Sequence, residues 1–444
     1  MRAGVNKTIL RLALPALGAL IAEPLFLLTD TAMVGYLGST PLAALGLAGT
    51  ILQTVVGLLI FLAYATTPFV ARRLGAGDTR GALAAGVDGM WLALLLGLVM
   101  AAAGFVFGSS VVSWFQAEVS VTAAATSYLT ISWWGLPGML LVLAATGVLR
   151  GLQNTMTPFV VAAVGFGANI ALNAVLIYGL GLGLEGSAVG TVIAQWGMAI
   201  WLTSSVIRRA ISERASLRPG RAGVFRAAQL GGWLFIRTIS LRIAFVGATV
   251  VATQLGTENL AAWHVAFTVF ALLALALDSL AIAAQTLIGN RLGAGDREGT
   301  QDVLRRTIRW GILAGVVLGA ILILAAPFFP LALTSDPTVR TLLTPVFIVL
   351  GLSMPLGGYV FVLDGVLMGA GDGRYLAITG VINLAVLLPL FWLTLGLAGS
   401  SSVVWLGVVV LQASIGFGYL GARALTLGLR AHRDKWMVMG VDNG

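Results

Sequence analysis

The chain has 444 residues, of which 59% are hydrophobic and only 10% are charged, and its mean hydropathy is +0.99. Ordinary globular proteins are nearer half apolar, so the composition excludes a typical soluble domain and indicates an integral membrane protein. The net charge is +9, and the chain has no cysteine and only two histidines, His264 and His432. This inventory excludes disulfides, thiolate chemistry and a histidine-rich metal site.

Twelve long apolar segments follow one another along the chain, separated by glycine, proline or clusters of arginine. A helix needs about 20 apolar residues to cross a bilayer, and each segment is long enough. The predicted spans are 10–35, 42–70, 84–107, 120–147, 158–179, 186–207, 229–254, 260–288, 306–328, 339–368, 376–396 and 402–427. The basic start resembles a signal peptide, but the apolar run continues past Asp30 without a break, which favours a retained first helix.

The first predicted span contains two carboxylates, Glu23 and Asp30, in the stretch AEPLFLLTD. They are seven residues apart, nearly two helical turns, so both side chains are expected on one face. Pro24 removes a backbone donor and predicts a kink. Because acids in the membrane are costly without a cavity or a partner, we interpret this span as a movable cation-binding element. The alternative is that the acids only pair with a buried arginine such as Arg242.

Polar side chains also share a face in the fifth predicted span, where Asn169 and Asn173 are four residues apart. Thr191 in the sixth span is expected to join them. Amide and hydroxyl oxygens beside a carboxylate can coordinate Na⁺ or hydrogen-bond a protonated acid. The predicted cation-coupling residues are therefore Asp30, Glu23, Asn169, Asn173 and Thr191. All of them except Glu23 are also the predicted ligands if the cation is Na⁺. Such residues also serve simply to hold membrane helices together, and the sequence leaves this alternative open.

The second half of the chain has its own buried acids. Asp278 lies deep in the eighth predicted span, with Gln285 one heptad later on the same face, and Asp364 lies near the end of the tenth span. Arg242 is expected deep in the seventh span. Ionisable residues inside a membrane are candidates for function, so Asp278, Asp364 and Arg242, with the amide of Gln285 beside Asp278, are candidates for lining a substrate cleft.

One charged, glycine-rich phrase occurs twice in the chain. RLGAGD stands at 73–78 and again at 291–296, so the second copy follows the first at an offset of 291 − 73 = 218. LGSTPLAA at 37–44 matches LGTENLAA at 255–262 with the same offset, and the glycines that follow the fourth and tenth spans keep it too. Three separated matches in one register indicate a duplicated six-span unit.

The offset contains an even number of spans, so the two halves are expected to have the same orientation in the membrane. Parallel repeats of this kind are a transporter architecture with the site at the interface between the halves. The predicted fold is an all-α integral membrane protein with twelve transmembrane helices in two parallel-repeat six-helix bundles around a central cleft. Residues 1–207 form the N-terminal lobe, 208–228 a solvated cytoplasmic linker, and 229–444 the C-terminal lobe with a cytoplasmic tail.

The positive charges lie almost entirely on one side of the predicted topology. With twelve spans, both termini and every even-numbered loop lie on the same side of the membrane. On the opposite side, the only basic residue is Arg340. This bias places both termini in the cytoplasm of a multi-pass protein of the inner (cytoplasmic) membrane. The topology in the membrane therefore explains the net positive charge, and no nucleic-acid partner is expected.

The motifs of common membrane enzymes are missing from the sequence. The glycines of RLGAGD lack the spacing and the Lys-Ser/Thr pair of a phosphate-binding loop, and no DxxxD or DxD pair that would hold Mg²⁺ is present. The sequence thus argues against an enzyme and predicts no cofactor. Energy for transport is expected from an ion gradient or a partner.

Several motifs together resemble one transporter family. They are LALP at 12–15, TDTAMVG at the end of the first span, RLGAGD in both loops, RGLQNTMTP at 150–158, NIALN at 169–173, ALDSLAIAAQ in the eighth span and LDGVLMGAGD at 363–372. Over roughly residues 8–430 the chain resembles the multidrug and toxic compound extrusion (MATE) transporters, most closely the DinF-like branch.

The resemblance implies export of hydrophobic, often cationic compounds in exchange for H⁺ or Na⁺, through a cleft between two six-helix bundles. It places Asp30 at the position of the family's essential first-span carboxylate, with Asn169 and Thr191 as its polar partners. Asn173 stands where prokaryotic relatives often have a second aspartate, which removes a titratable group. Glu23, where some relatives have an uncharged amide, is expected to compensate, and Asp278 matches the eighth-span acid of the DinF-like branch.

The resulting hypothesis is antiport by alternating access, with the cation bound at Asp30 and no resident metal. The partners expected are small hydrophobic or cationic substrates and membrane lipids, and the chain is expected to function as a monomer. The rival interpretation is a flippase for lipid-linked saccharides of the same superfamily, in which Arg242 would bind a pyrophosphate. A channel or a purely structural role fits less well with a duplicated fold that has buried acids.

Overall fold

The computed structural model describes residues 2–400 and 405–441, and all regular elements in that part of the chain are helical. Within these described residues, twelve helices are long and apolar enough to cross a membrane, which confirms the predicted all-α fold. They are Gly4–Gly35, Ser39–Gly75, Thr79–Ser113, Val119–Gly151, Met156–Gly179, Gly183–Ser212, Arg221–Gln254, Thr257–Gly293, Arg297–Ala325, Pro337–Gly369, Gly373–Ala398 and Leu406–His432. Most helices extend beyond the predicted limits, because hydropathy marks only the apolar part of a helix whose ends are polar.

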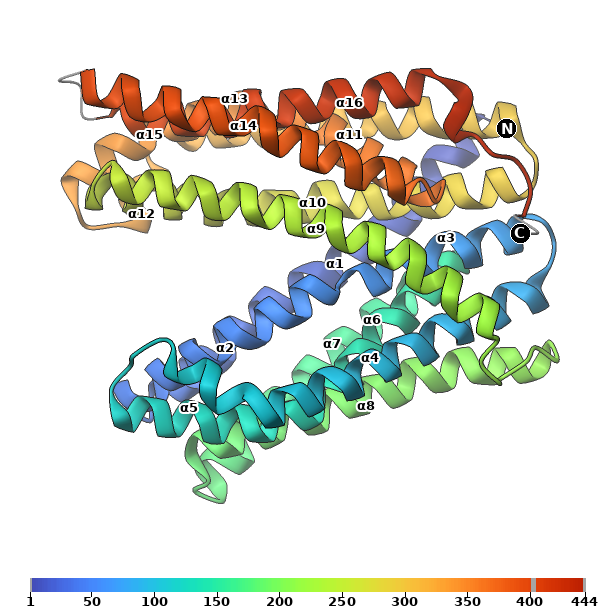
Figure 1. Ribbon diagram of the computed structural model, residues 1–444, viewed down its shortest axis with the longest axis horizontal. Coiled ribbons are helices and arrows are strands. Elements are labelled where there is room, and N and C mark those ends of the chain that lie inside the picture. The colour runs from blue at the N-terminus through green and yellow to red at the C-terminus, as the bar shows by residue number, and fades with distance from the viewer. Residues whose placement is uncertain (1, 401–404, 442–444) are drawn as a thin grey trace. The chain divides into compact units, whose positions relative to one another are not determined.

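Several spans consist of two or three consecutive elements (Figure 1). The first half of the chain contains α1(Arg2–Gly35), α2(Ser39–Leu59), α3(Phe61–Gly75), α4(Thr79–Ser113), α5(Val119–Ser132), the short η1(Trp133–Gly135), α6(Leu136–Gly151), α7(Met156–Asn173), the π-helical turn η2(Ala174–Gly179) and α8(Gly183–Ser212). The second half contains α9(Arg221–Gln254), α10(Thr257–Gly293), α11(Arg297–Ala325), α12(Phe329–Leu333), α13(Pro337–Gly369), α14(Gly373–Ser400), α15(Leu406–Ala413), the π-helical turn η3(Ser414–Tyr419), α16(Leu420–His432) and η4(Asp434–Trp436).

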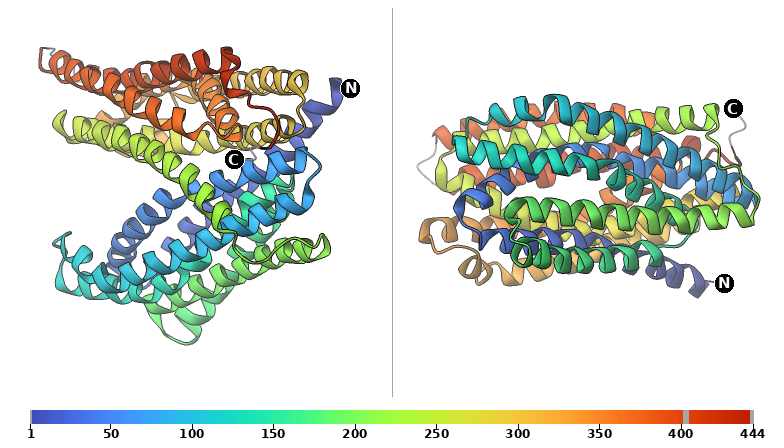
Figure 2. Two further views of the ribbon diagram at one scale, coloured as in Figure 1. Left: turned by 45° about the vertical axis from the view of Figure 1, so that its right-hand side comes forward. Right: turned by 90° about the horizontal axis from the view of Figure 1, so that it is seen from below.

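The chain divides into two compact units, each a bundle of helices (Figure 2). Among the described residues, we call the unit of residues 14–231 and 441 the N-unit, and the unit of residues 2–13, 232–400 and 405–440 the C-unit. The start of the chain, up to Ala13, thus groups with the second half. The linker predicted at 208–228 groups with the first half, and only the stretch between Ser212 and Arg221 is non-helical, because α8 and α9 continue into it from both sides.

The two units repeat one three-helix core. In the N-unit α3, α4 and α6 pack on one another, and in the C-unit the corresponding α10, α11 and α13 do the same. A Cβ atom on Gly147 would collide with the carbonyl oxygen of Ala63, and one on Gly365 would collide with that of Ala281. Both members of each pair keep the offset of the repeat, because 365 − 147 and 281 − 63 both equal 218. The repeat therefore extends to the closest backbone approaches, which only glycine permits.

RLGAGD forms the same turn in both units. The second glycine is in the left-handed region, with φ of 79° at Gly77 and 71° at Gly295. The aspartate that follows caps the next helix: Asp78 Oδ1 accepts from the Gly81 backbone N–H at 2.7 Å, and Asp296 Oδ1 accepts from that of Gly299 at 2.8 Å. The phrase is thus a structural turn in which glycine allows the reversal and aspartate begins the next helix.

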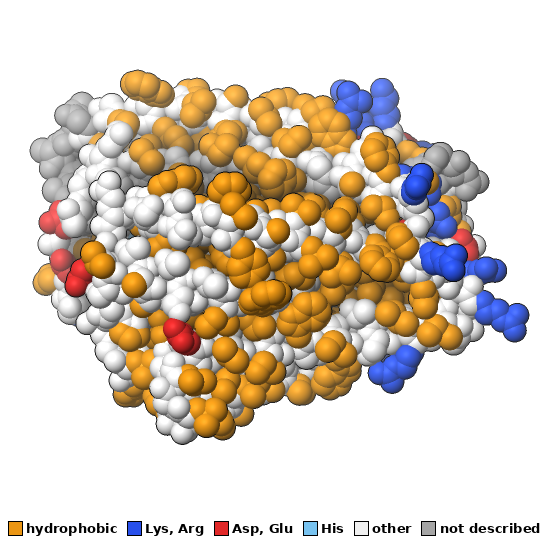
Figure 3. Space-filling view, turned by 60° about the horizontal axis from the view of Figure 1, so that its bottom comes forward, with side chains coloured by type: hydrophobic (Ala, Val, Ile, Leu, Met, Phe, Trp, Pro, Cys, Tyr) orange, Lys and Arg blue, Asp and Glu red, His pale blue; other side chains and the backbone are white. Residues whose placement is uncertain are grey.

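The outer surface of the helices is apolar. On the face drawn in Figure 3, hydrophobic side chains cover the length of the helices, and Lys and Arg side chains gather at one set of helix ends. Large apolar residues such as Leu98, Ile200, Leu324 and Trp392 are more than half exposed. A multi-pass protein needs this distribution, because lipid surrounds the middle of each span and water its ends.

Candidate functional site

Asp30, near the end of α1, is buried in the N-unit with only 5% of its surface exposed. Its Oδ1 atom accepts hydrogen bonds from Asn173 Nδ2 at 2.8 Å and from Ser187 Oγ at 2.7 Å. Both donors are uncharged. Within the N-unit, Asp30 is therefore held by the dipoles of an amide and a hydroxyl.

The hydrogen bonds continue away from Asp30 through α7 and α8. Asn173 Nδ2 also donates to Asn169 Oδ1 at 3.1 Å, and Asn169 Nδ2 donates to Thr191 Oγ1 at 3.2 Å. Residues four apart on a helix lie on one face, so α7 presents Asn169 and Asn173 together, and α8 presents Ser187 and Thr191. We call Asp30, Asn169, Asn173, Ser187 and Thr191 the Asp30 network. The structure brings four of the five predicted cation-coupling residues together, all but Glu23.

Two residues of this site were missed from the sequence. Ser187 donates directly to Asp30, and its spacing of four from Thr191 was a signal that could have identified it. Tyr128 on α5 is buried, and its hydroxyl lies against Ser187, Thr191 and Ser132. No motif points to Tyr128, because its place depends on α5 packing against α8.

The chain conformation changes directly beside the Asp30 network. The helix α7 ends at Asn173, and the segment that follows, Ala174–Gly179, forms a π-helical turn. Wider turns of this kind often occur at functional sites, where they rotate the side chains beyond them relative to a regular helix. Pro24 lies inside α1, which is helical on both sides of it.

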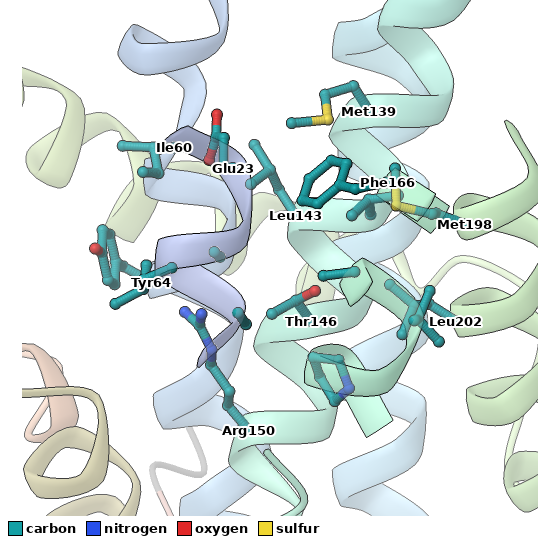
Figure 4. Close-up of a pocket in the computed structure, with 17 residues that line it drawn as sticks. Glu23, Ile60, Tyr64, Met139, Leu143, Thr146, Arg150, Phe166, Met198 and Leu202 are labelled. Atoms are coloured by element: carbon teal, nitrogen blue, oxygen red, sulfur yellow. The ribbon is translucent and has the colours of Figure 1, made fainter. Parts of the chain in front are cut away.

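Glu23 is not part of the Asp30 network, contrary to the expectation that the two acids act on one face of α1. Seven residues bring two side chains to one face but separate them by about 10 Å along the helix axis. Glu23 instead lines a separate cavity of about 110 Å³ within the N-unit, with residues of α3, α6, α7 and α8. Figure 4 shows Glu23 and Arg150 apart in this cavity, with Leu143 and Thr146 between them and Phe166 on the side of Met198.

Asp364, which the sequence marked as a candidate for lining a substrate cleft, is held in two ion pairs within the C-unit. Its Oδ1 atom accepts from Arg423 Nη2 at 2.8 Å, and its Oδ2 atom accepts from Arg237 Nη2. All three side chains are largely buried in the C-unit. Both carboxylate oxygens are thus committed to guanidinium groups from α9 and α16.

The remaining second-half candidates are scattered. Arg242 lies well inside α9, which runs from Arg221 to Gln254, and its side chain is exposed. Asp278 on α10 is partly buried, whereas Gln285 on the same helix is 1% exposed. A helical register of seven again places these two side chains on one face but at different depths.

The Asp30 network can hold one monovalent cation. It contains a single ionisable group, so taking up H⁺ or Na⁺ would neutralise its charge. Asn173 Oδ1 is a buried oxygen without a hydrogen-bond partner, and it lies beside Asp30. A buried acceptor of this kind is costly unless a donor or a cation meets it. The residues therefore fit a proton or a sodium ion coordinated by amide, hydroxyl and carboxylate oxygens.

Comparison with known proteins identifies one family model and several relatives that match most of this chain. The MatE family model matches residues 15–175 and 235–393. The chain is 31% identical to Protein DETOXIFICATION 44, chloroplastic, of Arabidopsis thaliana, over 92% of this chain and 80% of the relative. It is 27% identical to DNA damage-inducible protein F of Escherichia coli, over 92% of this chain and 90% of the relative.

The fold is similar to that of solved transporters. A mutant of the Vibrio cholerae MATE transporter VcmN superposes with a TM-score of 0.88 at 20% identity, covering 98% of this chain and 99% of that one. A MOP superfamily transporter from Pyrococcus furiosus superposes with a TM-score of 0.86 at 20% identity, covering 98% of this chain and 96% of that one. At this level of identity the likeness establishes the fold.

Proposed function

Since the chain belongs to the MatE family of membrane transporters, we propose that it is an antiporter that exports hydrophobic, cationic compounds in exchange for H⁺ or Na⁺ by alternating access. It would act as a monomer in the cytoplasmic membrane, with both termini in the cytoplasm and lipid around its apolar surface. Its relatives include a protein named as a probable multidrug resistance protein, NorM of Thermotoga maritima, at 25% identity.

The observation that carries this proposal is the Asp30 network. A lone carboxylate inside a membrane helix is costly, and in the described part of the N-unit the groups that donate hydrogen bonds to Asp30 are a neutral amide and a hydroxyl. Such a group can exchange between a charged and a neutralised state without leaving a buried counter-ion behind. Asp30 therefore fits a site that takes up a cation in one state of the transport cycle and releases it in the other.

Coupling follows from linkage between the cation and the exported compound. Binding of H⁺ or Na⁺ at Asp30 would alter the hydrogen bonds that join α1 to α7 and α8 and weaken the substrate complex. Reciprocity requires that the substrate lower the affinity for the cation by the same factor. Movement of the cation down its gradient would thus drive export of the bound substrate.

The test is transport by purified protein in liposomes, with a pH gradient and a Na⁺ gradient imposed separately. Asp30→Asn keeps the size of the side chain and removes its charge, so gradient-driven efflux of a fluorescent organic cation should fall to background. The matched control is Glu185→Gln, which removes an exposed carboxylate that accepts from Ser127 at 2.5 Å in the same unit. Full efflux by Asp30→Asn, or equal loss in both variants, would contradict the proposal.

The flippase for lipid-linked saccharides is the second candidate, and Arg242 is the residue that favours it. This exposed arginine lies well inside α9, which continues to Gln254. At the rise of a regular helix, that remaining stretch is about 18 Å long. A charge at that depth needs a polar neighbour or an anionic ligand. A flippase would lose activity with Arg242→Ala and give no drug resistance when overproduced, whereas the antiporter would keep Asp30-dependent efflux.

A further inference from the structure

The helix α9 belongs to both units. Its residues up to Gly231 group with the N-unit, and those from Gly232 group with the C-unit. The helix α1 changes unit between Ala13 and Leu14. The two changes are related by the repeat, since 232 − 14 = 218. The first helix of each half therefore crosses from one unit to the other at the same place.

The start of α9 is fastened to α4 by two hydrogen bonds. The Gly220 backbone N–H donates to Asp88 Oδ1 at 2.7 Å, and Trp91 Nε1 donates to the Leu217 carbonyl oxygen at 3.0 Å. Asp88 and Trp91 are three residues apart and so lie on one face of α4. A carboxylate beside the first amides of a helix satisfies an unpaired donor and the positive end of the helix dipole. We call residues 217–231 the α9 arm.

Packing extends these contacts along the α9 arm. Gly223 lies against Asp88 so closely that a Cβ atom on it would collide with the carboxylate, and Arg226 adds an electrostatic attraction to the same group. Ala227 is buried, and a Cβ atom on Gly231 would stand 2.6 Å from Phe61 Cε2. The arm is thus attached to the N-unit over its whole length.

Two adjacent glycines mark the point where the attachment ends. Glycine in a helix interior weakens the helix, and glycine pairs are common sites of bending. Close packing explains Gly231, but a Cβ atom on Gly232 would have nothing within 4 Å. Close packing therefore does not explain Gly232, and its measurable effect is to weaken the helix at this point relative to alanine.

We propose that the α9 arm moves as a part of the N-unit, held by Asp88 and Trp91, and that α9 flexes at Gly231–Gly232 during the transport cycle. The proposal builds on the alternating-access function proposed above, because that function requires a change in how the units are connected. Asp88 and Trp91 are then positioning residues that fix one side of the hinge. They act on transport without contacting the exported compound.

Covalent fastening of the arm provides the first test. The chain has no cysteine of its own, and a Cβ atom on Gly223 would be 3.3 Å from Asp88 Cβ, close to disulfide geometry. The double variant Asp88→Cys, Gly223→Cys should transport several-fold more slowly than wild type when reduced, because the hydrogen bond from the Gly220 N–H to the Asp88 carboxylate is lost. Oxidation should restore the rate. If the disulfide instead abolished transport, the arm would have to leave α4, and the proposal would be wrong.

The hinge itself is tested by one substitution with a matched control. Gly232→Ala stiffens α9 without a steric collision and should slow transport by about fivefold, the population change expected for one helical glycine. Gly197→Ala in α8 is the control, because a Cβ atom there also has nothing within 4 Å. Equal rates for Gly232→Ala and Gly197→Ala would overturn the proposal.

A distance measurement separates the hinge from the transport function. Spin labels at Phe225 and Ile243 flank the hinge on exposed positions of α9, with a sequence spacing of 243 − 225 = 18. Ile193 and Ile211 have the same spacing on exposed positions of α8. Pulsed electron resonance should give two distances for the first pair and one for the second. A single narrow distance in α9 would refute the hinge, whereas two distances without any efflux would refute only the proposed function.

Discussion

Asp30 and Asp364 are both buried carboxylates in spanning helices, yet their neighbours give them opposite properties. Asp30 accepts from an amide and a hydroxyl, whereas Asp364 accepts from the guanidinium groups of Arg237 and Arg423. Neutralising Asp30 leaves no ion behind. Neutralising Asp364 leaves two buried cations. Asp30 is therefore suited to exchange a cation, and Asp364 to hold α9, α13 and α16 together.

Asp364→Asn should destabilise the C-unit strongly. Breaking a buried ion pair by removing one partner typically costs about 3–5 kcal/mol, because the remaining charge is uncompensated. The measurement is unfolding of the purified protein in detergent, followed by circular dichroism.

The matched control for Asp364→Asn is Asp434→Asn, which breaks the pair with Arg297. The side chains of that pair are 59% and 51% exposed, so water can solvate the remaining charge. The expected loss is about 1 kcal/mol or less. Losses of the same size for both variants would contradict the argument from burial.

At the scale of elements, the four loops that join α3 to α4, α6 to α7, α10 to α11 and α13 to α14 have the same backbone conformation. Each contains one residue with positive φ shortly before the next helix: Gly77, Gln153, Gly295 and Gly371. The next residue donates its backbone N–H to a carbonyl five residues earlier, as Asp78 does to Arg73 at 2.9 Å and Asn154 does to Leu149 at 2.8 Å. One short-range motif thus ends one helix and begins the next at equivalent places of both halves.

The contact between α11 and α13 depends on glycine. A Cβ atom on Gly358 would collide with the carbonyl oxygen of Gly311, whereas one on the adjacent Gly357 would meet Leu277 Cδ1 at 3.6 Å, an ordinary contact. Gly358→Ala should therefore lower the free energy of unfolding by about 1–3 kcal/mol through overpacking.

Gly357→Ala is the control for this contact and should be neutral or slightly stabilising, because alanine is the better helix former. Thermal unfolding of the two variants in one detergent compares them directly. If Gly357→Ala were the more damaging variant, the packing of α11 against α13 would differ from the structure described.

At the scale of the whole chain, the clustering of basic residues predicts the orientation in the membrane. Glu118 and Glu213 stand in loops at opposite ends of the N-unit helices, before α5 and after α8. The positive-inside bias places Glu213 in the cytoplasm and Glu118 outside. In cells, a membrane-impermeant maleimide should label Glu118→Cys directly and Glu213→Cys only after permeabilisation. The reverse pattern would invert the proposed topology.

The repeat also belongs to the whole chain, and it explains why the two halves differ in chemistry. Duplication preserved the features that build each core, such as the glycines at 147 and 365 and the RLGAGD turns. The polar sites are not repeated: the position of Asp30 corresponds to Ala248, because 248 − 30 = 218, and that of Asp364 corresponds to Thr146. Architecture is therefore common to both units, while the candidate cation site belongs to the N-unit alone.

The number of spans, the all-helical fold, the repeat and the RLGAGD turns could all be predicted from the sequence. Each depends on local properties: the length of an apolar run, the left-handed conformation that glycine permits, and a capping aspartate three residues before an amide. The grouping of Asn169 with Asn173 was also predictable, since a spacing of four fixes a shared helical face.

Only the tertiary structure decided which polar groups meet. It placed Ser187 and Tyr128 beside Asp30, gave Asp364 two arginines, separated Glu23 from Asp30, and attached the start of α9 to Asp88. These contacts join residues that are far apart in the chain. Helical periodicity determines the direction of a side chain on its own helix, but the identity and depth of the neighbouring helix follow from packing, which no local pattern encodes.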